Sequence, residues 1–194
     1  MLSLPDWAFY PLAAAVSAGM ITAAVSFGDS THRSPEEILT EGTVIEGDAL
    51  SGLVTGNGLT ASFLEDEGTR FAQISAARGP LDGVQSAGAF FTLSEQELRA
   101  FEGHRLRVTY QLRSSSLQGA RTAQLNFFMP DRGQASWEVV EVSADIATVE
   151  LEVVSTVCTW PQAYVAIWPD WAGNANTIDL VSIRITALEE TPCD

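Results

Sequence analysis

Residues His104–Ser114 read HRLRVTYQLRS and decide the fold class, because apolar and polar side chains alternate along the whole stretch. Leu106, Val108, Tyr110 and Leu112 fall on one side of an extended chain, and the residues between them carry guanidinium, hydroxyl or amide groups. A period of two indicates a β-strand with one buried face and one solvent face. The stretch therefore predicts an antiparallel sheet that covers a core.

The same alternation recurs in Thr148–Val154, where the glutamates Glu150 and Glu152 take the solvent side. Turn residues such as Gly56-Asn57-Gly58 and Pro130-Asp131-Arg132-Gly133 separate shorter apolar runs. Further strands are expected at Leu59–Leu64, Arg70–Ala76, Gly88–Leu93, Ala123–Met129, Trp137–Val142, Ala163–Trp168 and Thr177–Ala187. Many short strands with this spacing predict an all-β antiparallel sandwich of about eight or nine strands.

One short helix is expected inside this β pattern, at Ser94–Phe101. Ser94 and Glu97 have the spacing of a capping box, in which each side chain binds the backbone N–H of the other residue. Earlier in the chain, Ser34-Pro35-Glu36-Glu37 has the same spacing and predicts a helical turn.

Three stretches resemble the jelly-roll family of carbohydrate-binding modules and galactose-binding-like domains: Phe101–Val108, Ala123–Phe128 and Asn176–Ile183. The resemblance covers roughly Thr43 to Ala187 and implies a jelly-roll arrangement of the sandwich. It concerns the fold more than any ligand, because one fold hosts many functions.

Aromatic residues gather in the C-terminal half, at Trp160, Tyr164, Trp168 and Trp171. In the family that the chain resembles, exposed rings stack on sugars while Asp, Asn and Arg bind hydroxyl groups. A ligand or partner surface is therefore expected at Trp168, Asp170, Trp171, Asn174 and Asn176. The alternative is that the rings belong to the core or to a protein interface, and the shared parity of Tyr164 and Trp168 favours one common face.

No cofactor is expected. Asp170, Asn174, Asn176 and Asp179 are oxygen-rich and are the candidates for a calcium site, although their spacing does not match an EF-hand loop. A solvated turn is the alternative interpretation. Two cysteines without a Cys/His cluster argue against a zinc site.

Charge limits the class of partner. The chain has 194 residues with 10 basic residues, all Arg, and 25 acidic residues, for a formal net charge of -15. Nucleic acid is excluded as a partner, because the phosphate backbone requires a basic face. Hydrophobic residues make up 46% of the chain, which is enough to form a core.

Residues Trp7–Gly28 contain no charged side chain and are long enough, as a helix, to cross a hydrocarbon core of about 30 Å. The chain is therefore expected to have a transmembrane anchor at 1–28, a polar stalk at 29–42 and a β domain at 43–194. A cleaved signal peptide is the alternative, but the first residues lack the Lys or Arg of such a signal.

Small residues recur at four-residue spacing within the anchor, at Ala15, Gly19 and Ala23. Such a stripe allows another helix to approach closely, so transmembrane helices of other proteins are expected as partners within the bilayer. The alternative is that the stripe faces lipid. We expect a single-pass protein of the inner membrane with its acidic C-terminal domain in the periplasm. There, Cys158 and Cys193 are expected to form a disulfide, and free buried cysteines are the alternative.

Motifs for catalysis are missing from the sequence. There is no G-x-S-x-G elbow, phosphate loop or dinucleotide fingerprint, and His32 and His104 lie in a stalk and at a strand start. The sequence favours a non-catalytic, membrane-anchored accessory subunit of a larger bacterial membrane complex, of respiratory or photosynthetic type. A tethered carbohydrate-binding module is the alternative, and a glycoside hydrolase-like enzyme is the third hypothesis.

Overall fold

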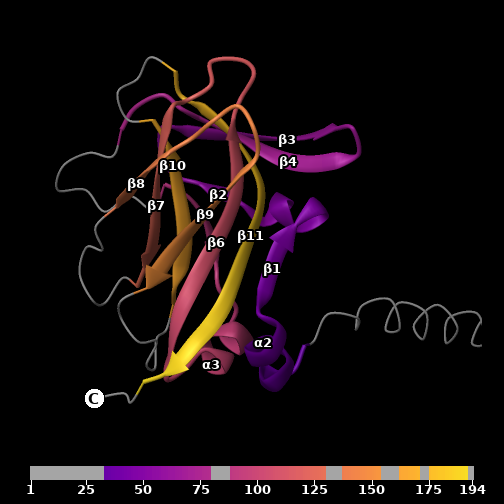
Figure 1. The fold of residues 1–194 in the computed structure, drawn as a ribbon, viewed down its shortest axis with the longest axis vertical. Helices are drawn as coiled ribbons and strands as arrows, with labels where there is room; N and C mark the ends of the chain where they lie inside the picture. The colour runs from indigo at the N-terminus through magenta and orange to yellow at the C-terminus, as the bar shows by residue number, and fades with distance from the viewer. Residues whose placement is uncertain (1–32, 80–87, 130–136, 154–161, 171–174, 192–194) are drawn as a thin grey trace, which may run out of the picture. The chain divides into compact units, whose positions relative to one another are not determined.

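The computed structural model describes residues 33–79, 88–129, 137–153, 162–170 and 175–191 (Figure 1). The chain divides into two compact units, Met1–Ser34 and Pro35–Asp194, and the description below concerns the second. The expected anchor and its stripe Ala15, Gly19 and Ala23 lie outside the described residues. Within the described ranges, no helix has the length and apolar character needed to cross a membrane.

Two antiparallel sheets form the second unit, as the alternation predicts. The six-stranded sheet has the order β3 (Leu59–Asp66), β4 (Thr69–Ala76), β11 (Thr177–Glu190), β6 (His104–Ser114) and β9 (Ala147–Val153), and β1 (Thr43–Glu46) also pairs with β11. The five-stranded sheet has the order β2 (Val54–Thr55), β5 (Ala89–Thr92), β10 (Tyr164–Pro169), β7 (Thr122–Phe128) and β8 (Glu138–Glu141). The two short strands β1 and β2 are additions to those predicted from the sequence.

The core lies between the two sheets. Leu106, Val108 and Leu112 of β6 are fully buried, and Leu125 of β7 and Val165 of β10 meet them from the other sheet. The two sheets are also joined by a polar contact at their centre. The hydroxyl of Tyr110 on β6 donates a hydrogen bond to the carbonyl oxygen of Ala166 on β10, 3.2 Å away.

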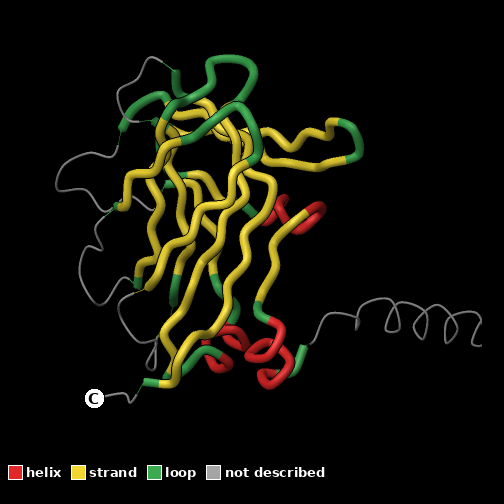
Figure 2. The backbone as a smooth tube through the Cα atoms, in the orientation of Figure 1, coloured by secondary structure: helices red, strands yellow, loops and turns green. Residues whose placement is uncertain are grey.

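Two short helices pack against each other at one end of the sandwich (Figure 2). In α3 (Glu95–Ala100) the expected capping box is present, because Ser94 and Glu97 each bind the backbone N–H of the other. In α2 (Pro35–Glu41) the side chain of Ile38 is buried in the core. The folded unit thus begins at Pro35, so the last residues of the segment expected as a stalk lie within it.

Gly42 joins α2 to β1 and explains how the chain enters the sheet. Its φ of +77° is in the left-handed region, and its N–H donates to the carbonyl of Ile38 at 2.8 Å. A Cβ atom at this position would collide with the backbone oxygen of Ile185 on β11. Glycine therefore allows α2 to end where β1 begins its pairing with β11.

The outer face of the six-stranded sheet is charged and internally paired. Arg107 contacts Glu152 at 2.9 Å and Glu150 at 3.4 Å, and Arg105 contacts Glu189 at 2.5 Å. The hydrogen bond from Arg107 holds the pKa of the Glu152 carboxyl below its ordinary value. These ion pairs are solvent-exposed. The outer face of the five-stranded sheet has a different chemical character.

Candidate functional site

The outer face of the five-stranded sheet carries the aromatic residues that the core does not use. Along β10, Val165 and Ile167 face the other sheet, so Tyr164, Ala166 and Trp168 lie on the opposite face, where Tyr164 is partly buried and Ala166 and Trp168 are fully buried. Strand pairing extends this outward row across the sheet. Tyr164 lies opposite Thr92 of β5 and Phe128 of β7, and Ala166 lies opposite Phe90 and Asn126.

Three rings meet at one end of this face. The ring of Tyr164 is stacked with that of Phe128, with centroids 4.9 Å apart and planes at 26°. The ring of Phe90 meets Tyr164 edge-on, with centroids 5.2 Å apart and planes at 90°. All three side chains are only partly buried, and the Tyr164 hydroxyl donates to the side-chain oxygen of Gln162. We call Phe90, Phe128 and Tyr164 the Tyr164 cluster.

Amide side chains lie beside the cluster on β7. Asn126 and Gln124 alternate with the core residue Leu125 and are both buried. The side-chain oxygen of Gln124 has no hydrogen-bond partner among the described residues. An unpaired buried acceptor of this kind costs about 1–3 kcal/mol. The row thus combines partly exposed rings at one end with buried amide groups beside them.

Trp168 closes the other end of the same row. Its side chain is 1% exposed, its indole N–H donates to the carbonyl of Arg78 at 2.9 Å, and Trp137 packs edge-on with centroids 6.1 Å apart. The expectation that Trp168 offers a ligand surface is therefore corrected. Its indole is enclosed by its neighbours, and its one hydrogen-bond donor is already used.

The loop residues predicted beside Trp168 have separate outcomes. Trp171 and Asn174 lie outside the described residues. The amide of Asn176 donates to the carbonyl of Ala76 and accepts from the Thr177 hydroxyl at 3.2 Å, so it joins two strands. The backbone N–H of Asp170 donates to the carbonyl of Thr122 at 2.9 Å. A binding role for Asp170, Trp171 and Asn174 stays a prediction.

Asp179 does not have the environment of a calcium ligand. Its buried carboxylate accepts hydrogen bonds from Arg113 Nε at 3.1 Å and from Gln73 Nε2 at 3.2 Å. It also lies on the outer face of the other sheet, opposite Arg113 in the β6–β11 pairing. The calcium candidacy of Asp179 is corrected, because a guanidinium neutralises it.

Over the ranges that the structure describes, no group of three His, Cys, Asp or Glu side chains could hold a metal ion. Cys158 and Cys193 lie outside those ranges, so their disulfide stays a prediction.

Apolar side chains also lie on the two edge strands, beside the Tyr164 cluster on β2 and at the Trp168 end of the row on β8. Val54 of β2 lies opposite Phe90, and Val139 of β8, 63% exposed, lies opposite Gln124. Among the outward residues of the five strands that are described, Glu141 of β8 is the charged one, and none is basic. The face is suited to binding a ligand that offers apolar surface and hydroxyl groups.

Sequence reasoning named Tyr164 in an aromatic group but missed its actual neighbours. Phe90 and Phe128 lie far from Tyr164 in the chain, and only the pairing of β5, β10 and β7 brings the three rings together. The sequence offered one signal, the alternation along each strand. Each of these phenylalanines is followed or preceded by a core residue of its own strand, which indicates that its ring lies on the opposite face.

Comparison with known proteins was made by sequence and by structure. No protein-family model matches the chain, and no curated protein matches it in sequence. Its structure is similar to the CBM22-1–CBM22-2 tandem domain of Xyn10C from Paenibacillus barcinonensis, with a TM-score of 0.51 and 9% identity. That match covers 73% of this chain and 42% of the tandem-domain chain.

A second solved structure gives a weaker match. It is the CBM22-1–GH10 portion of Xyn10B from Clostridium thermocellum, complexed with xylohexaose, with a TM-score of 0.49 and 13% identity over 72% of this chain and 27% of that one. At such identities a structural match shows the fold alone. The similarity to the tandem domain confirms a sandwich like that of carbohydrate-binding modules, the fold that the resemblance in the sequence implies.

Proposed function

We propose that this chain is a non-catalytic carbohydrate-binding protein that holds a neutral polysaccharide against the outer face of its five-stranded sheet. The observation that carries the proposal is the Tyr164 cluster, in which three aromatic rings stay partly exposed on a sheet face. Aromatic rings offer large apolar surfaces of defined geometry, and the tyrosine adds a hydroxyl group. The C–H faces of sugar rings provide a matching apolar surface.

The charge of the face supports a neutral ligand. The described outward residues of the five strands include no Arg, and the chain has a net charge of -15 and no Lys. A polysaccharide bearing carboxylates or sulfates would meet repulsion without a compensating cation. The partly exposed hydroxyl of Tyr164 can instead accept a hydrogen bond from an uncharged hydroxyl group.

The ring geometry supports a single polysaccharide chain as the ligand. Phe90 stands at 90° to Tyr164, so the cluster does not form one flat platform. A crystalline polysaccharide surface requires coplanar rings for contact, whereas one flexible chain can follow rings of different tilt. We therefore expect a soluble glycan to bind better than an insoluble crystalline one.

This proposal favours the tethered carbohydrate-binding module, which was the alternative hypothesis from the sequence, over the membrane accessory subunit. Neither the described residues nor the comparisons favour a respiratory or photosynthetic complex. A membrane anchor at 1–28 is compatible with glycan binding, because it would tether the domain at the membrane surface. The anchor remains a prediction.

Affinity gel electrophoresis of the full chain tests the proposal. Gels would contain xylan, mixed-linkage β-glucan, glucomannan or the acidic polymer polygalacturonate. We expect retardation by at least one neutral polymer and none by polygalacturonate. Tyr164→Ala should weaken binding about tenfold, which corresponds to about 1.4 kcal/mol of stacking.

Phe63→Ala is the matched control, because Phe63 is a partly exposed aromatic residue on the other sheet. It should bind the neutral polymers as the unaltered chain does, and circular dichroism should show that both variants are folded. Equal retardation of the Tyr164→Ala variant, or binding confined to polygalacturonate, would contradict the proposal.

A further inference from the structure

The β3–β4 hairpin projects beyond the sandwich (Figure 1). Leu59 at the start of β3 is buried, whereas the residues that follow it are partly or largely exposed on both faces of the strand. Over the described residues, β3 is the terminal strand of its sheet, so one of its edges has no neighbouring strand. Pairing with β4 is regular from Leu59↔Ala76 to Asp66↔Thr69, so no bulge interrupts that edge.

Residues that normally protect an exposed edge are missing from most of β3. Natural sheets block such edges with charged side chains, proline, bulges or very short strands. β3 is eight residues long, and Leu59–Leu64 contains neither proline nor a charged side chain. Phe63 and Leu64 are 49% and 43% exposed, on opposite faces of the strand. An unprotected edge of this length is suited to pairing with another strand.

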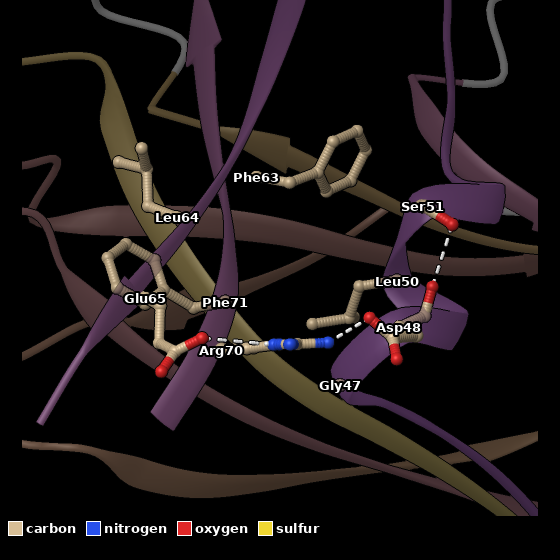
Figure 3. Close-up of a pocket in the computed structure, with 9 residues that line it drawn as sticks. All are labelled: Gly47, Asp48, Leu50, Ser51, Phe63, Leu64, Glu65, Arg70 and Phe71. Carbon is tan, nitrogen blue, oxygen red and sulfur yellow. Dashed lines mark hydrogen bonds and ion pairs between the residues drawn. The ribbon is translucent and has the colours of Figure 1, made fainter. Parts of the chain in front are cut away.

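A groove of about 270 Å³ lies between this hairpin and the 3₁₀ helix η1 (Gly47–Gly52), and Figure 3 shows its lining residues. Leu50 of η1 is buried and Phe63 of β3 contributes an exposed ring. Arg70 of β4 lies between two carboxylates: its Nε is 3.1 Å from Glu65, and its Nη1 contacts Asp48. The groove has room for about one side chain of a partner, and it is too small for a folded element.

The surroundings of the groove are negatively charged. Arg70 is already shared by Asp48 and Glu65, and the hairpin turn adds Asp66 and Glu67. Arg113 of β6 pairs with one of these carboxylates, since its Nη2 lies 3.7 Å from Asp66. Four carboxylates against the two guanidinium groups of Arg70 and Arg113 favour a basic partner, and the net charge of -15 opposes the approach of a second copy of this chain.

We propose that the outer edge of β3 is a docking site for an extended segment of another protein, in which Lys or Arg alternates with apolar residues. The segment adds a strand to the six-stranded sheet and inserts one apolar side chain between Phe63 and Leu50. Backbone hydrogen bonds to the β3 edge supply affinity, and the groove and the carboxylates select the side chains. This site lies on a different sheet from the Tyr164 cluster and does not depend on glycan binding.

Fluorescence anisotropy with labelled synthetic peptides tests the docking site in the full chain. The probes are eight-residue peptides in which Lys alternates with Val, Leu, Phe or Trp, together with the same peptides carrying Glu for Lys. A third set keeps the basic sequences but carries N-methyl groups on alternate backbone amides. Each sequence is made in two versions, one methylated at the odd-numbered amides and one at the even-numbered amides. Methylation removes hydrogen-bond donors and leaves charge and side chains unchanged.

We expect at least one basic peptide to bind at least tenfold more tightly than its acidic counterpart. One of the two N-methylated versions should bind at least tenfold more weakly than its parent peptide. Phe63→Ala should also weaken binding of the parent peptide at least tenfold. Leu117→Ala, a substitution of an exposed apolar residue elsewhere, and Tyr164→Ala should leave it unchanged. The proposal would be overturned if no basic peptide binds, or if both N-methylated versions bind as tightly as the parent peptide. It would also be overturned if Phe63→Ala leaves peptide binding unchanged. Concentration-dependent dimerisation of the chain alone that Phe63→Ala abolishes would also overturn it, in favour of a second copy as the occupant.

Discussion

Tyr110 carries its hydroxyl group into the middle of the core, where it reaches the carbonyl of Ala166 at 3.2 Å. Burial raises the pKa of this phenol far above its ordinary value, because the surroundings disfavour a phenolate. The native chain therefore keeps the proton above about pH 10, where the unfolded chain releases it. The contribution of this phenol to the free energy of unfolding is fully present below pH 10 and is lost as the pH rises further.

Tyr110→Phe tests this linkage. At pH 7 the variant should be less stable by about 1 kcal/mol, the usual value of a buried hydrogen bond. Above pH 10 the unaltered chain loses about 1.4 kcal/mol per pH unit through this phenol, and the variant does not. The two free energies of unfolding, measured in urea, should converge near about pH 11. Parallel pH profiles would contradict the prediction.

Asp179 is the second residue whose chemistry depends on burial. Asp179→Ala would remove the nearest carboxylate from Arg113 and one of the two acceptors of Gln73 Nε2, and it should lower the free energy of unfolding by about 2–3 kcal/mol. Glu95→Ala, which removes an exposed carboxylate 2.5 Å from Arg99, should cost less than about 1 kcal/mol in the same denaturation experiment. Equal effects of the two variants would contradict a structural role for the Arg113–Asp179 pair.

At the scale of elements, the sequence predicted what local alternation determines. The bounds of β6 are those expected from the sequence, and the ends of β3, β4, β7 and β9 differ from expectation by one or two residues. The strands β1, of four residues, and β2, of two residues, were not predicted from the sequence. The rings of Phe90 and Phe128 could not be assigned to Tyr164, because pairing between distant strands leaves no local pattern.

The helix α2 provides a test of where the folded unit begins. Ile38 is 3% exposed and its neighbour Leu39 is 37% exposed. Ile38→Ala should lower the free energy of unfolding by about 2–4 kcal/mol, because it leaves a cavity in the core. Leu39→Ala, the matched control, should cost less than about 1 kcal/mol. If both variants unfold at the same urea concentration as the unaltered chain, α2 does not contribute to the fold.

At the scale of the whole molecule, the tether remains a prediction from the sequence. If Trp7–Gly28 spans a membrane, the chain should stay with membranes during alkaline carbonate extraction, and a reporter fused after Asp194 should be active only outside the cytoplasm. Mass mapping under non-reducing conditions should then join Cys158 to Cys193. Release by carbonate would contradict the anchor, and cytoplasmic activity of the reporter or two free thiols would contradict the orientation or the disulfide.

The position of β11 has a consequence for how the chain is made. β11 is the last strand along the described chain, yet it lies in the middle of its sheet, paired with β1, β4 and β6. During translation, the β3–β4 and β6–β9 pairs must wait for residues 177–190 before they can join into one sheet. Until then the nascent chain exposes apolar faces and free strand edges, the surfaces through which incomplete chains aggregate. A message that stops before codon 177 would therefore produce no smaller version of this domain, only pairs of strands without the strand that unites them.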